Sequence, residues 1–194
     1  VADGLGARYE SGIDKAIVVS MGTGTSFVKC EGCNMEHIGG IGTGGGTLQG
    51  LSRLLLNTND IKFVSEIATR GNLGNINLLI GDISAKPLPG LPMDATASLF
   101  GKAQSNTSQE DIAKGLVCLV LQSIGSAAIL AGQGTGINEY ILIGNLTLLP
   151  QCNDIFPASP KPTGVPLHRP KHSVCCSAIG AALCYAQPLW HHRT

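Results

Sequence analysis

Two glycine-rich stretches near the start of the chain are the most informative feature of its sequence. They are VVSMGTGTSF, Val18 to Phe27, and HIGGIGTGGGTLQGLSRLLL, His37 to Leu56. Glycine loses much backbone entropy on folding, so it is favoured where a chain bends sharply or approaches something closely. Each glycine loop follows a segment typical of a strand, and the second leads into leucines with helical spacing. Two such loops indicate a ligand that is contacted by main chain.

The two loops carry the groups that bind phosphate. A phosphate is held best by several N–H groups, by one or two hydroxyls and by the positive end of a helix dipole. Gly22 to Ser26 supplies the first two, and Gly44 to Thr47, at a helix start, supplies all three. Neither loop has the lysine of a P-loop or the fingerprint of a dinucleotide-binding fold. Simple tight turns are the alternative interpretation.

The composition argues against several function classes. The 194 residues include 13 basic and 13 acidic ones, so no nucleic-acid partner or polybasic membrane surface is expected. Aromatic residues make up 4%, too few for a base-stacking surface. The seven cysteines are irregularly spaced and no signal peptide precedes them, which is typical of reduced thiols in the cytoplasm.

Strand and helix patterns alternate along the chain, which predicts a mixed α/β sheet. The first residues have the pattern of the end of a helix. Strands are predicted at Ala16–Ser20, at SFVK and MEHI as a hairpin around CEGCN, at Ile76–Gly81 and at Tyr140–Asn145. Helices are predicted at Thr47–Leu56, Ile61–Arg70, Ser108 to about Ala131, and Ser177–Ala186.

The uncharged segment from Gly115 to Gln133 is interpreted as a core or interface helix. Ser108, with Asp111 three residues later, is a capping-type start for it. Polar residues such as Gln122, together with several glycines and alanines, leave it short of the ~20 strongly apolar residues of a membrane span. No membrane partner is therefore expected.

The pair Cys30 and Cys33 has the spacing of a redox or metal-ligand motif. A zinc site needs a second pair or histidines, and Cys175 and Cys176 adjoin rather than repeat the spacing. The preferred interpretation is a hairpin turn, and no metal site is predicted.

Several motifs occur in the order found in one family. They are MGTGTSF, HIGGIGTGGGTLQGLSRLL, GDI, DATASLFGK, YILIGNLT and SAIGAAL. Together they resemble type II pantothenate kinases, the bacterial relatives of the eukaryotic fumble-type enzymes, from about Asp3 to Ala186. The resemblance implies an α/β, actin-like ATPase (ribonuclease H-like) fold, mainly its C-terminal domain, with residues 1–194 as the C-terminal nucleotide-binding portion. Pro157 to Lys171 matches poorly and has more prolines than a strand-bearing region should have.

The resemblance also implies roles for individual residues. Thr23 would meet the nucleotide phosphates, Ile61 would touch adenine and Asn145 would contact the nucleotide after the late strand, although a turn residue is an equal interpretation of Asn145. His37 takes the place of an arginine on the pantothenate side, where it can donate to a carboxylate or hydroxyl; without the resemblance it is an exposed strand residue. The full set of ATP-binding residues is Thr23, Gly45, Gly46, Thr47, Leu48, Gln49, Ile61 and Asn145.

The implied activity is transfer of the γ-phosphoryl group of MgATP to pantothenate, giving 4'-phosphopantothenate for coenzyme A synthesis. ATP and Mg²⁺ are the implied cofactors, and residues 111–131 the implied interface of a homodimer. The family's aspartate-glycine loop and catalytic glutamate should lie upstream of Val1, and Asp3 does not match the motif, so no catalytic residue is assigned in this chain. The alternatives are a non-catalytic nucleotide-binding or dimerisation module, and a kinase of a sugar or other small hydroxyl compound.

Overall fold

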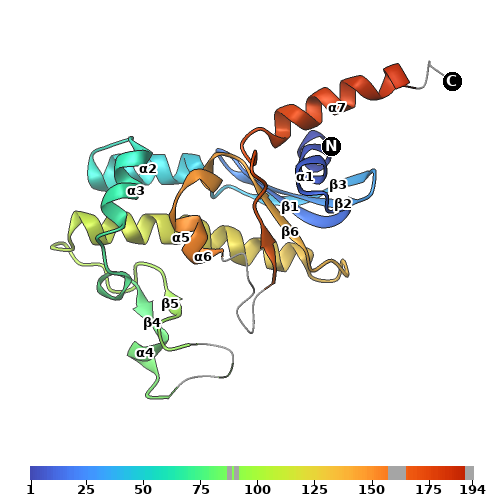
Figure 1. Cartoon of the computed structure of the whole chain (residues 1–194). Helices are drawn as coiled ribbons and strands as arrows, with labels where there is room; N and C mark the ends of the chain where they lie inside the picture. The colour runs from blue at the N-terminus through green and yellow to red at the C-terminus, as the bar shows by residue number, and fades with distance from the viewer. Residues whose placement is uncertain (87–88, 90–91, 157–164, 191–194) are drawn as a thin grey trace. The chain divides into compact units, whose positions relative to one another are not determined.

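The chain divides into two compact units. The computed structural model describes residues 1–86, 89, 92–156 and 165–190 (Figure 1). The first unit is formed by Val1–Thr47 and Gln122–Thr194, and the second by Leu48–Leu121.

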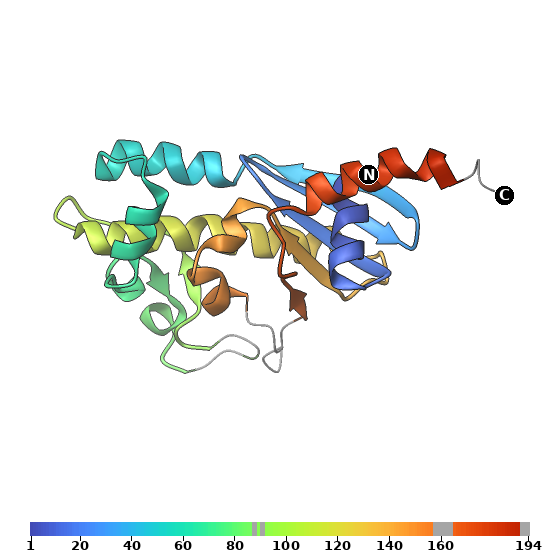
Figure 2. The same cartoon turned by 45° about the horizontal axis from the view of Figure 1, so that its top comes forward.

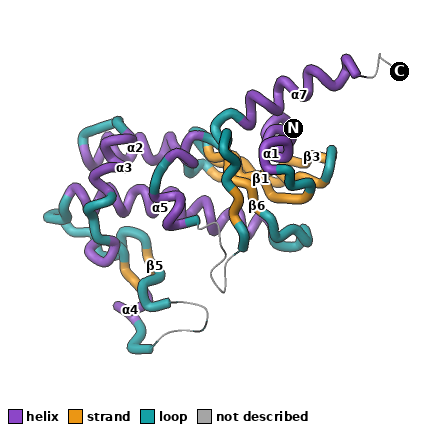
Figure 3. Tube along the Cα trace, in the orientation of Figure 1, coloured by secondary structure: helices purple, strands orange, loops and turns teal. Residues whose placement is uncertain are grey.

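Within the described residues, the first unit is built on a five-stranded sheet with the order β3-β2-β1-β6-β7 (Figure 3). The strands β1, β2 and β3 form an antiparallel meander, while β6 is parallel to both β1 and β7. The central strands β1 and β6 are buried almost throughout, which explains their continuous apolar runs. The bounds are β1 Lys15–Met21, β2 Thr25–Glu31, β3 Asn34–Ile41, β6 Tyr140–Ile143 and β7 Leu167–His168.

Two helices from opposite ends of the chain cover one face of this sheet. Helix α1 (Ala2–Ser11) and helix α7 (Cys176–Trp190) lie side by side there (Figure 2). Residues Ala7 and Cys176 bring both helices into one buried cluster with the sheet residues Ala16, Val18, Val28, Cys30, Ile141 and Ile143. The small-residue motif near the C-terminus therefore forms the predicted helix, and α7 is longer than expected.

The two helices touch through their backbones. A Cβ atom placed on Gly6 would lie 1.8 Å from the carbonyl oxygen of Cys176, and one on Gly180 would lie 1.7 Å from that of Ala2. Only glycine fits at these positions, because a carbonyl oxygen of a packed helix cannot move aside. A hydrogen bond from the Ser177 hydroxyl to Asp3 adds a polar contact between the helices.

The second unit is mainly helical, and its fully buried side chains include Leu48, Val64, Ile76, Leu116 and Leu121. Asp60 caps α3 by accepting hydrogen bonds from the N–H groups of Lys62 and Phe63. The elements are α2 Gly45–Leu56, which begins in the first unit, α3 Ile61–Ala68, η1 Leu73–Asn75, β4 Leu78–Leu79, α4 Ile80–Ile83, β5 Thr96–Ser98, and α5 Gln109–Gly132, which continues into the first unit.

The prediction of a strand over Ile76–Gly81 is wrong for most of that segment. Only the short β4 pairs, with β5. The side chain of Asn77 is fully buried and accepts a hydrogen bond from the N–H of Phe100, and Asp82 accepts one from the N–H of Leu79. These side-chain bonds to the backbone compete with a strand ladder, so the chain turns into α4 instead.

Helix α5 confirms the predicted start, but one part of the expected cap is different. The hydroxyl of Ser108 accepts a hydrogen bond from the N–H of Asp111, as a cap residue does. The carboxylate of Asp111 is buried and accepts from the N–H of Asn72 and the side-chain amide of Asn75. Chiefly the bond from Asn72 holds the pKa of Asp111 below its usual value. The acid therefore anchors a distant loop rather than its own helix start.

Helix α5 is long and apolar enough to cross a membrane by length and composition, but half of its most apolar window is buried within the chain. That burial is typical of a core helix. Its exposed large apolar side chains are Ile129 and Leu130, near the C-terminal end.

We expect the contact between α1 and α7 to be sensitive to a single methyl group. Gly180→Ala should lower the free energy of unfolding by about 1–3 kcal/mol or more, because the backbones must separate. Gly50→Ala is the matched control, since a Cβ at Gly50 in α2 meets nothing within 4 Å and should be stabilising. Denaturant unfolding measures both, and equal midpoints for the two variants would contradict the observed packing.

Candidate functional site

The C-terminal ends of the parallel strands β1 and β6 meet at one edge of the sheet, where ligands bind in open α/β sheets. The first glycine loop follows Met21, and Gly144 and Asn145 follow β6. A Cβ on Gly144 would lie 2.5 Å from the carbonyl oxygen of Met21, and the φ of Gly144 is 95°. Glycine is thus required at this position, and it places Asn145 beside the first loop.

The two glycine loops are bonded to each other. The N–H of Gly45 donates to the carbonyl of Gly22 at 2.8 Å, and the N–H of Gly46 donates to that of Thr23 at 2.9 Å. A Cβ on Gly46 would lie 2.7 Å from the side-chain methyl of Thr23. Two of the N–H groups at the start of α2 are therefore used by the first loop, so fewer of them are free for a phosphate.

Two threonine hydroxyls complete this loop junction, which comprises residues 22–25 and 42–47. The hydroxyl of Thr25, a residue only 4% exposed, donates to the carbonyl of Thr43 at 2.8 Å. The hydroxyl of Thr47 donates to the carbonyl of Gly42 and accepts from the N–H of Gly44. The hydroxyl of Thr47 thus organises the loop before α2.

Two of the predicted ligand residues are exposed at the junction with unused polar groups. Among the described residues, neither the hydroxyl of Thr23 nor the side-chain amide of Asn145 has a hydrogen-bond partner, and both residues are exposed. Leu146, the residue after Asn145, approaches within 3.8 Å of the position a Cβ on Gly45 would take. The first loop, the start of α2 and the turn that carries Asn145 and Leu146 therefore meet in the first unit.

An open cavity of about 440 Å³ lies beside the first loop and includes His37. Strand register places Ser20 opposite Ser26, and Ser26 opposite Gly40. A β-bulge, with Gly39 at a φ of 148°, then brings His37 opposite Val28. The lining residues are Ser20, Gly22, Gly24, Thr25, Ser26, His37, Gly40 and Ile41.

Ser20 was not predicted as a site residue, and Ser26 was assigned to the first glycine loop rather than to β2. Both side chains lie on the same face of their strands as buried apolar residues of β1 and β2. A polar residue at the end of such an apolar run is the signal that could have pointed to them. Together with His37 they give the cavity two hydroxyls and an imidazole.

Three predicted ATP-binding residues belong to the second unit. Leu48 and Gln49 follow Thr47 within α2, and Ile61 begins α3. Leu48 is fully buried, whereas Gln49 is exposed. Their roles stay predictions.

The site contains no acid, since residues 20–26, 37–47 and 144–147 include neither aspartate nor glutamate. The cysteines do not add a metal site among the described residues, where no group of three potential ligands is found. Cys33 is exposed in the turn between β2 and β3, which confirms the predicted hairpin, and burial raises the pKa of Cys30.

Comparison with known proteins gives consistent matches. Residues 12–149 match the family model described as Fumble. A type II pantothenate kinase from Staphylococcus epidermidis is 33% identical over 138 residues, covering 69% of this chain and 52% of that protein. One from Bacillus cereus is 33% identical over 146 residues, covering 74% and 52%. A 4'-phosphopantetheine phosphatase from Mus musculus is 37% identical over 134 residues, covering 66% and 16%. The chain spans about half the length of the bacterial relatives that it matches.

The hydroxyl of Thr25 should control how firmly the two loops are joined. Thr25→Val keeps the shape but leaves the Thr43 carbonyl unpaired, so the Gly45 and Gly46 amides should exchange with solvent about fivefold to tenfold faster. Thr25→Ser should restore protection. Thr135→Val, which removes a hydroxyl bond to the carbonyl of Gly132 elsewhere in the first unit, should leave these two amides unchanged. Unaltered exchange in Thr25→Val would show that the bond does not hold the loops.

Proposed function

Because the chain belongs to the Fumble family, we propose that it is the nucleotide-binding part of an ATP-dependent pantothenate kinase with an actin-like ATPase fold. The reaction transfers the γ-phosphoryl group of ATP to the primary hydroxyl of pantothenate, giving 4'-phosphopantothenate in the cytoplasm. The observation that carries this proposal is the loop junction, where the Thr23 hydroxyl has no partner among the described residues and where the first loop lines the cavity that includes His37.

The chain's own residues fit a nucleotide. The hydroxyl of Thr23 can donate to phosphate oxygens, the amide of Asn145 can donate and accept, and the positive end of the α2 dipole lies at Gly45. Mg²⁺ prefers carboxylate oxygens as its protein ligands, and this site offers none. The residues present therefore do not fit a protein-held magnesium ion, and we assign no step to one.

The cavity fits the other substrate. The hydroxyls of Ser20 and Ser26 and the imidazole of His37 can donate hydrogen bonds to the carboxylate and hydroxyl groups of pantothenate. A residue that accepts the proton of the attacking hydroxyl is required as well. The alternative is a non-catalytic nucleotide-binding module.

The function is tested by an ADP-release assay with pantothenate and a panel of sugars, on this chain and on the longest reading-frame product that contains it. We expect the longer product to release ADP from ATP when pantothenate is present, and not when a sugar replaces it. His37→Ala should raise the Michaelis constant for pantothenate about tenfold, the value of one lost hydrogen bond to a charged group, and leave that for ATP unchanged. His37→Arg should retain binding.

Two outcomes would contradict the proposal. Nucleotide binding without turnover in the longer product would favour the non-catalytic module. Turnover with a sugar only would assign the protein to the sugar kinases that share the implied fold.

We further propose that the protein is a homodimer through α5. Leu130, 65% exposed near the end of this helix, is the residue to test. Leu130→Glu should shift sedimentation towards monomer. In an isologous interface both subunits contribute the same surface, so the substitution buries one new charge from each of them. Leu54→Glu, at an 80% exposed leucine of α2, is the control. Dissociation by the control variant alone would place the interface elsewhere.

A further inference from the structure

The turn that carries Asn145 is held by residues from the distant segment after β7. The N–H of Gly144 donates to the carbonyl of Ser173 at 3.0 Å. The hydroxyl of Thr147 donates to the carbonyl of Gly144 and lies 2.7 Å from the hydroxyl of Ser173. Thr147 and Ser173 are 3% and 6% exposed, so these bonds are shielded from water. The turn is therefore fixed by long-range contacts.

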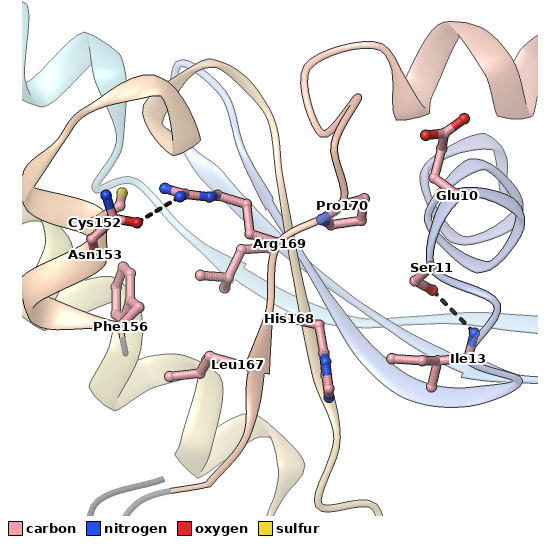
Figure 4. Close-up of a pocket in the computed structure, with 11 residues that line it drawn as sticks. Glu10, Ser11, Ile13, Cys152, Asn153, Phe156, Leu167, His168, Arg169 and Pro170 are labelled. Atoms are coloured by element: carbon pink, nitrogen blue, oxygen red, sulfur yellow. Dashed lines mark hydrogen bonds between the residues drawn. The ribbon is translucent and has the colours of Figure 1, made fainter. Parts of the chain in front are cut away.

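Arg169 joins this network from the end of β7. Its Nη1 donates to the carbonyl of Thr147 at 3.1 Å and its Nη2 donates to Oδ1 of Asn153 at 2.5 Å. Figure 4 shows the side chain reaching from the strand across to Asn153, which lies on helix α6 (Gln151–Ile155). Because the guanidinium is planar and its donors have fixed directions, the two bonds set the turn and α6 relative to the strand.

The position of the Arg169 guanidinium is not explained by an ion pair. Among the described residues, no carboxylate lies within 4 Å of its guanidinium, and the nearby acids have other partners. Glu10 pairs with His172, and Glu139 with His168. Arg169 borders a cavity of about 410 Å³ with an apolar wall that includes Phe156 and Leu167. Its described hydrogen-bond partners are neutral acceptors on the turn and on α6.

We propose that Arg169 is a positioning residue for Asn145. By holding the Thr147 carbonyl, it keeps the turn after β6 in the conformation that presents the Asn145 amide to the nucleotide. This inference rests on the proposed function, in which Asn145 contacts ATP. Arg169 lies beyond residues 12–149, the part that matches the family model, so the role belongs to the part of this chain outside that match.

The test is nuclear magnetic resonance of the ¹⁵N-labelled chain, with Arg169→Gln, Arg169→Lys and the control Lys171→Gln, which removes a neighbouring exposed cation. Amide exchange is measured at Thr147 and Leu149, whose N–H groups close the turn onto Gly144 and Leu146. MgADP is then titrated while the side-chain amide of Asn145 is followed, since this readout detects weak binding.

We expect Arg169→Gln to raise the amide exchange rate in the turn about tenfold. It should raise the dissociation constant for MgADP, read from the Asn145 side-chain amide, by a similar factor. Arg169→Lys should restore part of both, and Lys171→Gln should change neither. Unchanged exchange and an unchanged Asn145 response in Arg169→Gln would overturn the proposal. If Arg169→Gln exchanges faster but the wild-type chain shows no response to MgADP, Arg169 stabilises the turn and the proposed nucleotide-binding function is wrong.

Discussion

Two backbone hydrogen bonds, from Gly45 to Gly22 and from Gly46 to Thr23, are the contacts on which the site depends. They fix the start of α2 against the loop after β1, so that the positive end of the helix dipole lies beside that loop. Both bonds require close backbone approach, which explains the glycines better than ligand contact alone does.

This arrangement changes how a phosphate would be held. A free helix start offers several N–H groups, but here two of them are already used within the protein. Side chains therefore have to supply more of the recognition. The hydroxyl of Thr23 and the amide of Asn145, which have no partner among the described residues, are the groups that we propose for it. The cavity with His37 is lined by the same short loop, so the proposed nucleotide and substrate positions share that loop.

Local patterns in the sequence predicted the parts of the fold that local forces determine. Helical spacing and caps gave α2, α3, α5 and α7, and the buried runs gave β1 and β6. Long-range contacts decided the rest. The buried Asn77 turned an expected strand into a helical turn, and α6 was not predicted. Strand pairing places Ser20 opposite Ser26, and the return of the chain after β7 brings Arg169 to the Thr147 carbonyl. No local pattern encodes the contact of Arg169. Of the poorly matching segment, residues 157–164 lie outside the described part, and the remainder contains β7.

We propose that the loop junction and the Asn145 turn form one nucleotide site next to a substrate cavity. The most direct measurement is a crystal structure of the chain, or of the longest product containing it, with a non-hydrolysable ATP analogue. The account predicts phosphate oxygens within hydrogen-bond distance of the Thr23 hydroxyl and the Asn145 amide, with the bonds from Gly45 and Gly46 to the first loop intact and the His37 cavity free of nucleotide. Phosphates bound to the Gly45 and Gly46 N–H groups, with the two loops parted, would contradict it.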